Sequence, residues 1–488
     1  MSDVKTLATR SAAGTRHAAG TGAILAIILI SYFMILLDNS VIFTGLPSIR
    51  VSLDMSATQL TWVQDAYTLV FGGLLLLGAR AGDIVGRRRL FIVGLAIFGT
   101  ASLLIGLAPT GSWMIAGRAV QGVGAAIVAP SSLALITAYF QGQERNRAVA
   151  WYGATAGIGA SLGLLVGGAL TTWISWRAAF LVNVPIAVAM IIGAKVVLTE
   201  TPRQRGRFDV PGAVFATLGM GALVFGIIES SESGWTSPVV IASLGLGVVL
   251  LVALVANEAR AEQPIMPLRL FASRERSGAY GARMLYLGAM IGFFFFSTQL
   301  MQDGLGFTPL QAGLGFLPMS LVNFAVALSI PRLSTRVSNA VLLCSGIALT
   351  LVGMAWLSRA GIDGSYLVSV ALPMALIGAG QGLAFAPLTN AGLAGVAPQD
   401  AGAASGLVNT AHQLGMALGL GVLVAVSAHA GAGLHGPAAV AAQVEVALTG
   451  AAVLLAASLL VALTVVLPKR QRAASPARTS SGAARYRA

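Results

Sequence analysis

The chain has 488 residues, of which 56% are hydrophobic and only 10% are charged. Its mean hydropathy of +0.84 lies well above the range of soluble globular domains, which excludes a water-soluble fold. The formal net charge is +13, but the Lys and Arg residues are scattered over short loops and tails, so we expect no nucleic-acid-binding domain. The single cysteine, Cys344, offers neither a disulfide framework nor a thiolate metal site, and no sequence motif indicates a metal or cofactor.

Fourteen apolar segments, each long enough for one helix to cross a bilayer, follow one another along the chain. The segment that begins at Gly22 is too long for a cleavable signal peptide, so we expect it to remain as the first span. The sequence therefore predicts an all-α polytopic protein of the cell membrane with fourteen transmembrane helices. The predicted spans are 21–46, 60–80, 90–108, 112–139, 147–170, 178–198, 210–229, 237–256, 279–302, 309–330, 339–358, 366–391, 402–427 and 444–467.

The distribution of basic residues predicts the orientation of these spans. Nearly all Lys and Arg residues outside the spans lie in the two tails and in the loops after the even-numbered spans. The loops of the opposite side hold only Arg50, Arg177 and Arg359. Because positive charge is retained in the cytoplasm, we expect both termini to be cytoplasmic.

A faint internal repeat divides the chain into two parts. Gln121-Gly122 in span 4 recurs as Gln381-Gly382 in span 12, and a glycine pattern of span 5 recurs in span 13. Both matches relate spans that are eight apart, which favours two parallel six-helix bundles with an extra pair between them. The predicted parts are an N-terminal cytoplasmic tail (1–20), a first bundle (21–198), a linker with two extra helices (199–278), a second bundle (279–467) and a basic disordered cytoplasmic tail (468–488).

The loop after span 2 combines an acid with an arginine cluster, in the string Asp83-Ile-Val-Gly86-Arg87-Arg88. A carboxylate near helix ends and neighbouring arginines can form charge-assisted contacts that hold one side of a transporter closed. Asp83, Gly86, Arg87 and Arg88 are therefore candidate gating residues. A cluster that serves only as a topology signal is the alternative.

Asp38 and Arg118 are two of the few charged residues that lie within predicted spans. Asp38 is the only acid in roughly thirty residues of membrane-compatible sequence, and Arg118 lies in span 4. Burial raises a carboxyl pKa and a nearby arginine lowers it, so Asp38 beside Arg118 is a candidate site for loading and releasing a proton. The alternatives are a purely structural Asp38 and an Arg118 that reaches the membrane surface from the helix end.

Span 5 carries a row of small residues at Gly159, Gly163, Gly167 and Gly168. Small residues one helical turn apart allow a second helix to approach closely, which suits a pivot or seal between the bundles. General helix packing is the alternative explanation.

These motifs resemble the major facilitator superfamily, and within it the fourteen-helix branch of drug:proton antiporters. The resemblance covers almost the whole chain except the tails, and includes Asn183-Val-Pro185 at span 6. Ala79 and Ile84 replace the usual Gly and Arg of the loop motif. Leu164 replaces the usual Pro of the antiporter motif, so the helix kink expected there is in doubt.

Five further residues are candidates for the lining of a substrate cavity. Asp65 is expected in the outer part of span 2, where solvated cavity lining suits it better than proton carriage. Gln121 belongs to the Arg118 motif, and Phe293 and Phe296 offer an aromatic surface to apolar ligands. His412 stands where members of the resembled family more often carry Arg; it could titrate near neutral pH, or be a polar substitution without that role.

The resemblance implies a proton-coupled exporter of hydrophobic or amphiphilic small molecules such as antibiotics or drugs, and no enzyme. The sequence has no nucleotide-binding motif, so the energy would come from an ion gradient, worth about 2.3 kcal/mol per charge per 100 mV. The expected partners are a drug-like substrate, protons and membrane lipid, with a monomer as the expected state. A facilitator or importer of a small metabolite and a receptor-like relative that does not transport are the alternatives.

Overall fold

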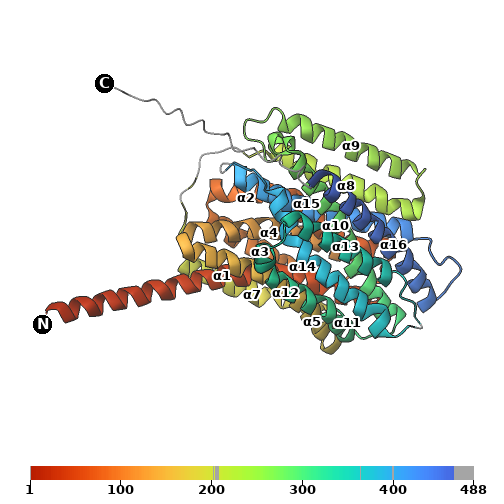
Figure 1. Ribbon diagram of the computed structural model, residues 1–488, viewed down its shortest axis with the longest axis horizontal. Helices are drawn as coiled ribbons and strands as arrows, with labels where there is room; N and C mark the ends of the chain where they lie inside the picture. The colour runs from red at the N-terminus through yellow and green to blue at the C-terminus, as the bar shows by residue number, and fades with distance from the viewer. Residues whose placement is uncertain (1, 202, 204–207, 363, 398–399, 467–488) are drawn as a thin grey trace, which may run out of the picture.

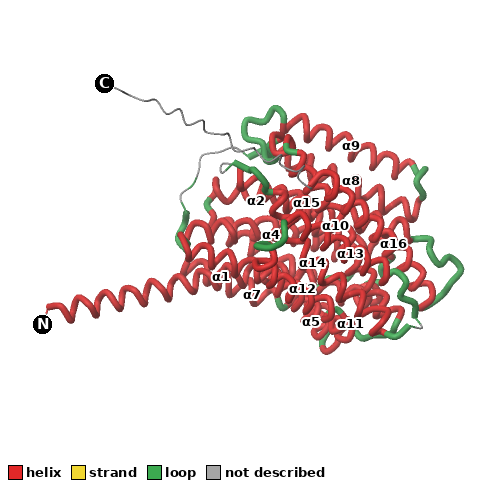
Figure 2. The backbone as a smooth tube through the Cα atoms, viewed as in Figure 1, coloured by secondary structure: helices red, strands yellow, loops and turns green. Residues whose placement is uncertain are grey.

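The computed structural model describes residues 2–201, 203, 208–362, 364–397 and 400–466, and the predicted tail 468–488 lies outside this range. The described part of the chain is almost entirely helical and contains no strand (Figures 1 and 2). The helices are α1 (Ser2–Ser52), α2 (Ala57–Val85), α3 (Arg87–Gly106), α4 (Gly111–Tyr139), α5 (Gly142–Trp173), α6 (Trp176–Leu181), α7 (Asn183–Val197), α8 (Val210–Ser233), α9 (Pro238–Glu258), η1 (Leu268–Ala272), α10 (Arg274–Gln299), η2 (Leu300–Gly304), α11 (Pro309–Gly315), α12 (Leu317–Leu333), α13 (Asn339–Leu357), η3 (Leu367–Ala371), α14 (Leu372–Gly392), α15 (Ala401–Ser427), α16 (Pro437–Val461) and η5 (Ala462–Val466).

Thirteen helical segments of the described chain are long and apolar enough to cross a membrane. They match thirteen of the predicted spans, and the predicted span 147–170 falls within α5, whose apolar segment Ser161–Trp173 is shorter than the others. The number of crossings therefore stays a prediction where α5 is concerned.

Two predicted spans, 178–198 and 309–330, are each interrupted near the start. The first is divided between α6 and α7 at Val182, and the second between α11 and α12 at Phe316. In each case a proline, Pro185 or Pro318, lies in the first turn of the second helix. Proline lacks the N–H that would continue the preceding helix but fits the first turn of a new one, which explains both breaks.

The helix ends gather at two opposite faces of the bundle. The first, which we call the Arg50 face, holds the connections from α1 to α2, α3 to α4, α5 to α6, η2 to α11 and α15 to α16. The second, the Asp83 face, holds the connections from α2 to α3, α4 to α5, α12 to α13 and α14 to α15. Side chains close several of these helix ends, as in the capping boxes of Ser56 with Gln59 and Thr308 with Gln311.

Helices α1–α7 pack mainly on one another, and so do helices α10–η5; we refer to them as the amino half and the carboxyl half. Near the Arg50 face the two halves share one hydrophobic core, to which α1 contributes Leu46 and α10 contributes Phe293. Toward the Asp83 face the cores are separate: one cluster around Phe98 belongs to the amino half and another around Leu407 to the carboxyl half and the segment before it. The halves therefore share a hydrophobic core near the Arg50 face, whereas farther toward the Asp83 face they meet along α2 and α15.

Polar contacts reinforce this junction. Arg50 at the end of α1 forms an ion pair with Asp303 of η2 at 3.2 Å. Gln302 Nε2 donates to the carbonyl oxygen of Thr44 at 2.9 Å. The Leu310 N–H of α11 donates to Oγ1 of Thr172 on α5 at 3.0 Å, so that the Arg50 face is closed from two sides.

Helices α8 and α9 lie along one edge of the bundle, at the top in Figure 1. α8 packs on both α2 and α15, and α9 packs on α8. A cavity of about 70 Å³ lies between the extra pair and helices α2 and α15, with Met220 and Leu414 in its wall. The extra pair thus covers the seam where α2 of the amino half meets α15 of the carboxyl half.

Candidate functional site

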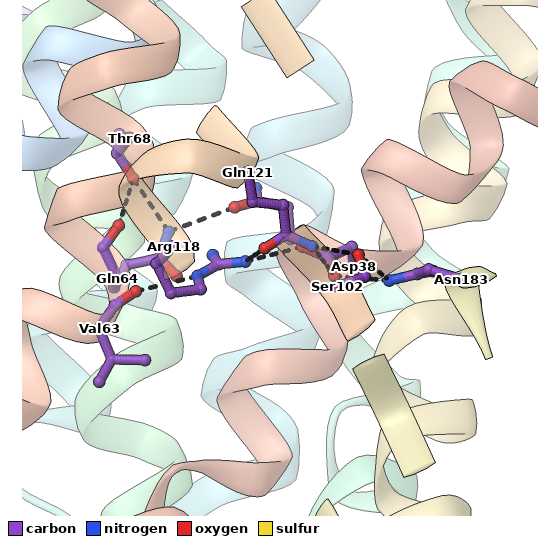
Figure 3. Close-up of polar contacts among 9 residues, drawn as sticks. Asp38, Val63, Gln64, Thr68, Ser102, Arg118, Gln121 and Asn183 are labelled. Atoms are coloured by element: carbon purple, nitrogen blue, oxygen red, sulfur yellow. Dashed lines mark hydrogen bonds and ion pairs between the residues drawn. The ribbon is translucent and has the colours of Figure 1, made fainter. Parts of the chain in front are cut away.

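Asp38 lies in α1 and is completely buried. Its carboxylate accepts three hydrogen bonds from two other helices (Figure 3). Arg118 Nη1 of α4 donates to Oδ2 at 2.7 Å, and Gln121 Nε2 of α4 donates to Oδ1 at 2.8 Å. Asn183 Nδ2, in the first turn of α7, donates to the same Oδ1 at 2.8 Å. Asp38 is therefore the point at which α1, α4 and α7 are joined by polar contacts.

Arg118 is also completely buried, so it does not reach the membrane surface as the alternative required. Besides Asp38, its guanidinium donates to the carbonyl oxygen of Val63 at 3.0 Å and to Gln121 Oε1 at 2.7 Å. It also lies 4.2 Å from the ring centroid of Tyr67, a cation–π contact. These partners hold the Arg118 guanidinium in the orientation in which it donates to the Asp38 carboxylate.

The Asp38–Arg118 pair is isolated from solvent, and that isolation determines what it can do. Removing one charge from a buried ion pair costs about 3–5 kcal/mol, because the other charge is left without a partner. Protonation of Asp38 would likewise leave Arg118 without a counter-charge, so the packing of α1 against α4 and α7 is expected to depend on the proton state of this carboxyl. Arg118 Nη2, Asn183 Oδ1 and the Tyr67 hydroxyl have no hydrogen-bond partner among the described residues, which leaves polar groups for a second arrangement.

The helix that carries Asp38 is held by the glycine row of α5. A Cβ on Gly159 would lie 2.9 Å from Leu36 Cβ, and one on Gly163 would lie 2.9 Å from the carbonyl oxygen of Leu37. A Cβ on Gly167 would lie 2.7 Å from the Val41 oxygen. These three glycines therefore let α5 lie directly against the stretch of α1 that contains Asp38.

Gly168, next in sequence, faces the other half. A Cβ there would lie 2.5 Å from the carbonyl oxygen of Pro309 on α11. Gly313 of α11 is placed reciprocally, since its Cβ would lie 2.6 Å from the carbonyl oxygen of Leu164. The row thus serves two contacts, one within the amino half and one between the halves.

The predicted gating residues lie together at the Asp83 face. Arg87 donates through Nε and Nη2 to Asp83 Oδ1 at 3.1 and 2.9 Å, and through Nη1 to the carbonyl oxygen of Ala134. Arg88 donates to the carbonyl oxygens of Ala194 and Lys195. All of these contacts stay within the amino half.

Gly86 forms the turn between α2 and α3 with φ of +113°, a backbone conformation that suits glycine. A Cβ there would also lie 2.6 Å from Oε1 of Glu200. The Glu200 carboxylate accepts hydrogen bonds from the N–H groups of Arg88 and Arg89, and so closes the start of α3. Glu200 was not among the residues expected from the sequence.

The other residues predicted to line a cavity are more buried than expected. Asp65 is completely buried, and neither of its carboxylate oxygens has a hydrogen-bond partner among the described residues. Phe293 and Phe296 lie in the shared core, where Phe293 packs edge-on against Phe316 at the break between α11 and α12. Their contact with a substrate stays a prediction.

His412 has a partner that the sequence analysis did not identify. Its Nδ1 lies 3.2 Å from Nη2 of Arg283, a buried arginine of α10. The sequence does show Arg283 as a charged residue within the predicted span 279–302, and this could have indicated a polar partner for His412. Asn183 was likewise seen only as part of a resemblance, and not as a ligand of Asp38. Among the described residues no three His, Cys, Asp or Glu side chains are grouped in a way that could hold a metal ion.

The comparison with known families now decides the classification. The sequence pattern of the Major Facilitator Superfamily matches residues 28–420. The chain belongs to this superfamily. It is thus a transporter and not an enzyme, and a multi-pass protein of the cell membrane.

Two relatives illustrate the position of this transporter in the superfamily. It is 40% identical over 453 residues to the cephamycin export protein CmcT of Amycolatopsis lactamdurans, covering 91% of this chain and 92% of that protein. It is 40% identical over 408 residues to the puromycin resistance protein pur8 of Streptomyces alboniger, covering 83% of this chain and 81% of that protein.

The fold agrees with solved transporter structures. A bacterial homologue of the human lysosomal transporter Spinster, solved in an inward-facing and occupied conformation, aligns with a TM-score of 0.66 at 14% identity. The alignment covers 90% of this chain and 95% of that structure. At this identity the likeness establishes the fold alone.

Proposed function

We propose that the transporter is a proton-coupled antiporter that exports hydrophobic or amphiphilic small molecules, antibiotics or drugs among them, and so confers resistance. The names of its relatives, a cephamycin export protein and a puromycin resistance protein, support this substrate class. In this proposal all fourteen predicted spans cross the membrane, both termini are cytoplasmic, and the Asp83 face is therefore the cytoplasmic one.

The observation that carries the proposal is the buried pair of Asp38 and Arg118. A carboxylate that is sealed from solvent, hydrogen-bonded to two other helices and balanced by one cation is expected to change its neighbours' packing when it takes up a proton. In the ionised form Asp38 holds α1 against α4 and α7. In the protonated form Arg118 loses its counter-charge, and its free Nη2 is available to another acceptor.

The closure of the Arg50 face fits one stage of such a cycle. With the Arg50 face outside, the structure corresponds to a form closed to the outside, in which Asp38 is ionised and cargo is taken up from the cytoplasmic side. Opening to the outside then requires separation of Arg50 from Asp303 and of α5 from α11. Asp83, Arg87 and Arg88 are proposed to steady the cytoplasmic gate, although their contacts in this form lie within the amino half.

Transport into everted membrane vesicles tests the coupling. The vesicles are energised with a pH gradient, and cephamycin, puromycin and lincomycin are added as test compounds. The intact protein is expected to accumulate at least one compound while partly dissipating the gradient, and an uncoupler should abolish both effects. An importer would instead release compound from preloaded vesicles, and a receptor-like protein would leave the distribution unchanged.

The decisive variant is Asp38→Asn, which removes the titratable group and keeps the side-chain size. We expect uncoupler-sensitive accumulation to disappear. Because this change leaves Arg118 buried without a counter-charge, Asp38→Asn combined with Arg118→Met serves as the control for folding. If Asp38→Asn still accumulates cargo against its gradient with uncoupler sensitivity, Asp38 is not the proton carrier.

A further inference from the structure

The carboxyl half contains a buried cation that has no counter-ion. Arg283 lies in α10, and only 2% of its surface is exposed. Among the described residues it forms no ion pair, whereas the comparably buried Arg118 of the amino half is paired with Asp38. A buried guanidinium without a neighbouring carboxylate is costly, so its persistence needs an explanation.

The groups around Arg283 come from two other helices and are all neutral. Nη1 donates to Thr389 Oγ1 of α14 at 3.0 Å, and Nη2 lies 3.2 Å from His412 Nδ1 of α15. The ring of Phe385, also on α14, stands 4.8 Å from the guanidinium carbon. Arg283 Nε has no hydrogen-bond partner among the described residues, which leaves one donor of the guanidinium free.

The arrangement lies beside an accessible surface. Phe385 is 38% exposed, and Thr389 on the next turn of α14 is partly exposed. Arg283 is nine residues from the start of α10, which places it about 14 Å from the Asp83 face. On the side of α14 away from that face, Gln381 adds an amide whose oxygen accepts no hydrogen bond from the described residues.

The internal repeat makes the contrast between the halves specific. Gln381 corresponds to Gln121, which donates to Asp38 in the amino half. In the carboxyl half no hydrogen bond from the equivalent amide to an acid is found among the described residues. Asp65 is a buried carboxylate whose two oxygens have no hydrogen-bond partner among the described residues, and it forms no ion pair with Arg283.

We propose that Arg283, with Thr389, His412 and Phe385 around it, is a binding site for the anionic group of the cargo, a carboxylate or similar monoanion attached to an apolar body. A planar guanidinium matches a carboxylate through paired N–H donors, and Phe385 offers an aromatic face to the apolar part. This inference rests on the proposed export function and narrows its substrate class from hydrophobic or amphiphilic small molecules in general to those that carry an anionic group.

Binding of matched probes to the purified full-length chain in phosphatidylcholine nanodiscs tests the assignment. The probes are 1-pyrenebutyrate, its methyl ester and the amine analogue 1-pyrenebutylamine, which share one apolar body and differ in charge. Fluorescence titration should show that the carboxylate binds at least tenfold more tightly than the ester or the amine. Equal binding of the three, or no binding of any, overturns the inference without recourse to a variant.

Variants assign the preference to the site. Arg283→Gln should lower carboxylate affinity roughly 10- to 100-fold and leave ester affinity within about twofold, as expected for loss of hydrogen bonds to a charged group. Arg283→Lys keeps the charge without the fork and should retain part of the preference, which also provides a second variant if the first does not fold. Arg359→Gln removes an equal charge from an exposed pair with Glu445 and should have no effect. If Arg359→Gln weakens carboxylate binding as much as Arg283→Gln does, net charge and not the site is responsible.

An anionic lipid headgroup has the same chemistry as the proposed cargo group, and a second set of nanodiscs distinguishes the two. Adding phosphatidylglycerol should leave carboxylate affinity unchanged if the site takes cargo. A loss of affinity that is seen with the intact chain and absent in Arg283→Gln would assign the site to lipid and overturn the cargo assignment. These experiments measure binding and not transport. If the vesicles show no transport, the export proposal is refuted, but the preference for the carboxylate probe still decides whether Arg283 forms an anion-binding site.

Discussion

Replacement of Gly168 by alanine should weaken the junction between the halves without touching the proposed proton site. The added Cβ would lie 2.5 Å from the carbonyl oxygen of Pro309 and 3.0 Å from the Leu310 Cα. Both are backbone atoms of α11, so they cannot move aside by rotation of a side chain. The overlap exists only while the Arg50 face is closed, because α5 and α11 belong to different halves.

The size of the effect follows from the cost of overpacking a close contact, about 1–3 kcal/mol. Since each 1.36 kcal/mol corresponds to a tenfold change, the closed form should lose population against the open form by roughly 5- to 150-fold. Gly167→Ala is the matched control on the adjacent position. Its Cβ would meet the Val41 oxygen of α1 at 2.7 Å, inside the amino half, so it lowers stability in both forms equally.

Accessibility of a cysteine provides the assay. Ala312 of α11 is fully buried at the junction, so Ala312→Cys on a Cys344→Ser background reports opening of the Arg50 face. A membrane-impermeant maleimide added outside intact cells should label the Gly168→Ala protein faster by the factor given above. Gly167→Ala should leave the labelling rate unchanged. Equal labelling of the two variants would show that the contact of Gly168 with α11 does not hold the face closed.

Three further outcomes are expected. Arg118→Lys keeps the charge but loses the planar fork, so uncoupler-sensitive efflux should fall at least tenfold at unchanged membrane expression; full activity would reduce Arg118 to a topology signal. Asp83→Ala removes the acceptor of two Arg87 hydrogen bonds and should lower the maximal transport rate more than cargo affinity, and the reverse result would refute a gating role. The hydrogen bond and charge of Arg269 lower the pKa of Asp400, so their contact stabilises the protein above the ordinary aspartate pKa and is lost as the pH falls through the lowered one. Arg269→Gln should therefore shift the acid-induced loss of thermal stability to higher pH, and identical acid midpoints in a fluorescence unfolding assay would contradict this.

Hydrophobic length and motif spacing allowed much of the fold to be predicted. Thirteen apolar helices coincide with predicted spans because a lipid-exposed helix needs about 20 apolar residues, a constraint that shows directly in the sequence. The breaks at Val182 and Phe316 were not foreseen, although Pro185 and Pro318 were visible. Proline is tolerated within membrane helices when neighbours satisfy the freed carbonyl groups, so its presence alone does not predict a break.

The charged residues of the candidate site were predicted from the sequence, but their hydrogen-bond partners were not. Asp38 and Arg118 could be singled out because charge is rare within apolar segments. Asn183 could not, since an uncharged amide at the start of a helix is common, and only the fold places it 2.8 Å from Asp38. Glu200 was overlooked for a similar reason: it is one of several charges in a loop, and its contact with α3 depends on tertiary structure.

The position of α8 across the α2–α15 seam has a consequence for how cargo arrives. α8 ties the two halves together along that edge, whereas α5 and α11 on the opposite edge meet near the Arg50 face without a covering helix. The extra pair therefore covers the α2–α15 seam, whereas the seam on the side of α5 and α12 has no such cover. In the proposed export cycle, a route from the lipid into the protein is therefore expected on the side of α5 and α12, and not through the seam that α8 covers.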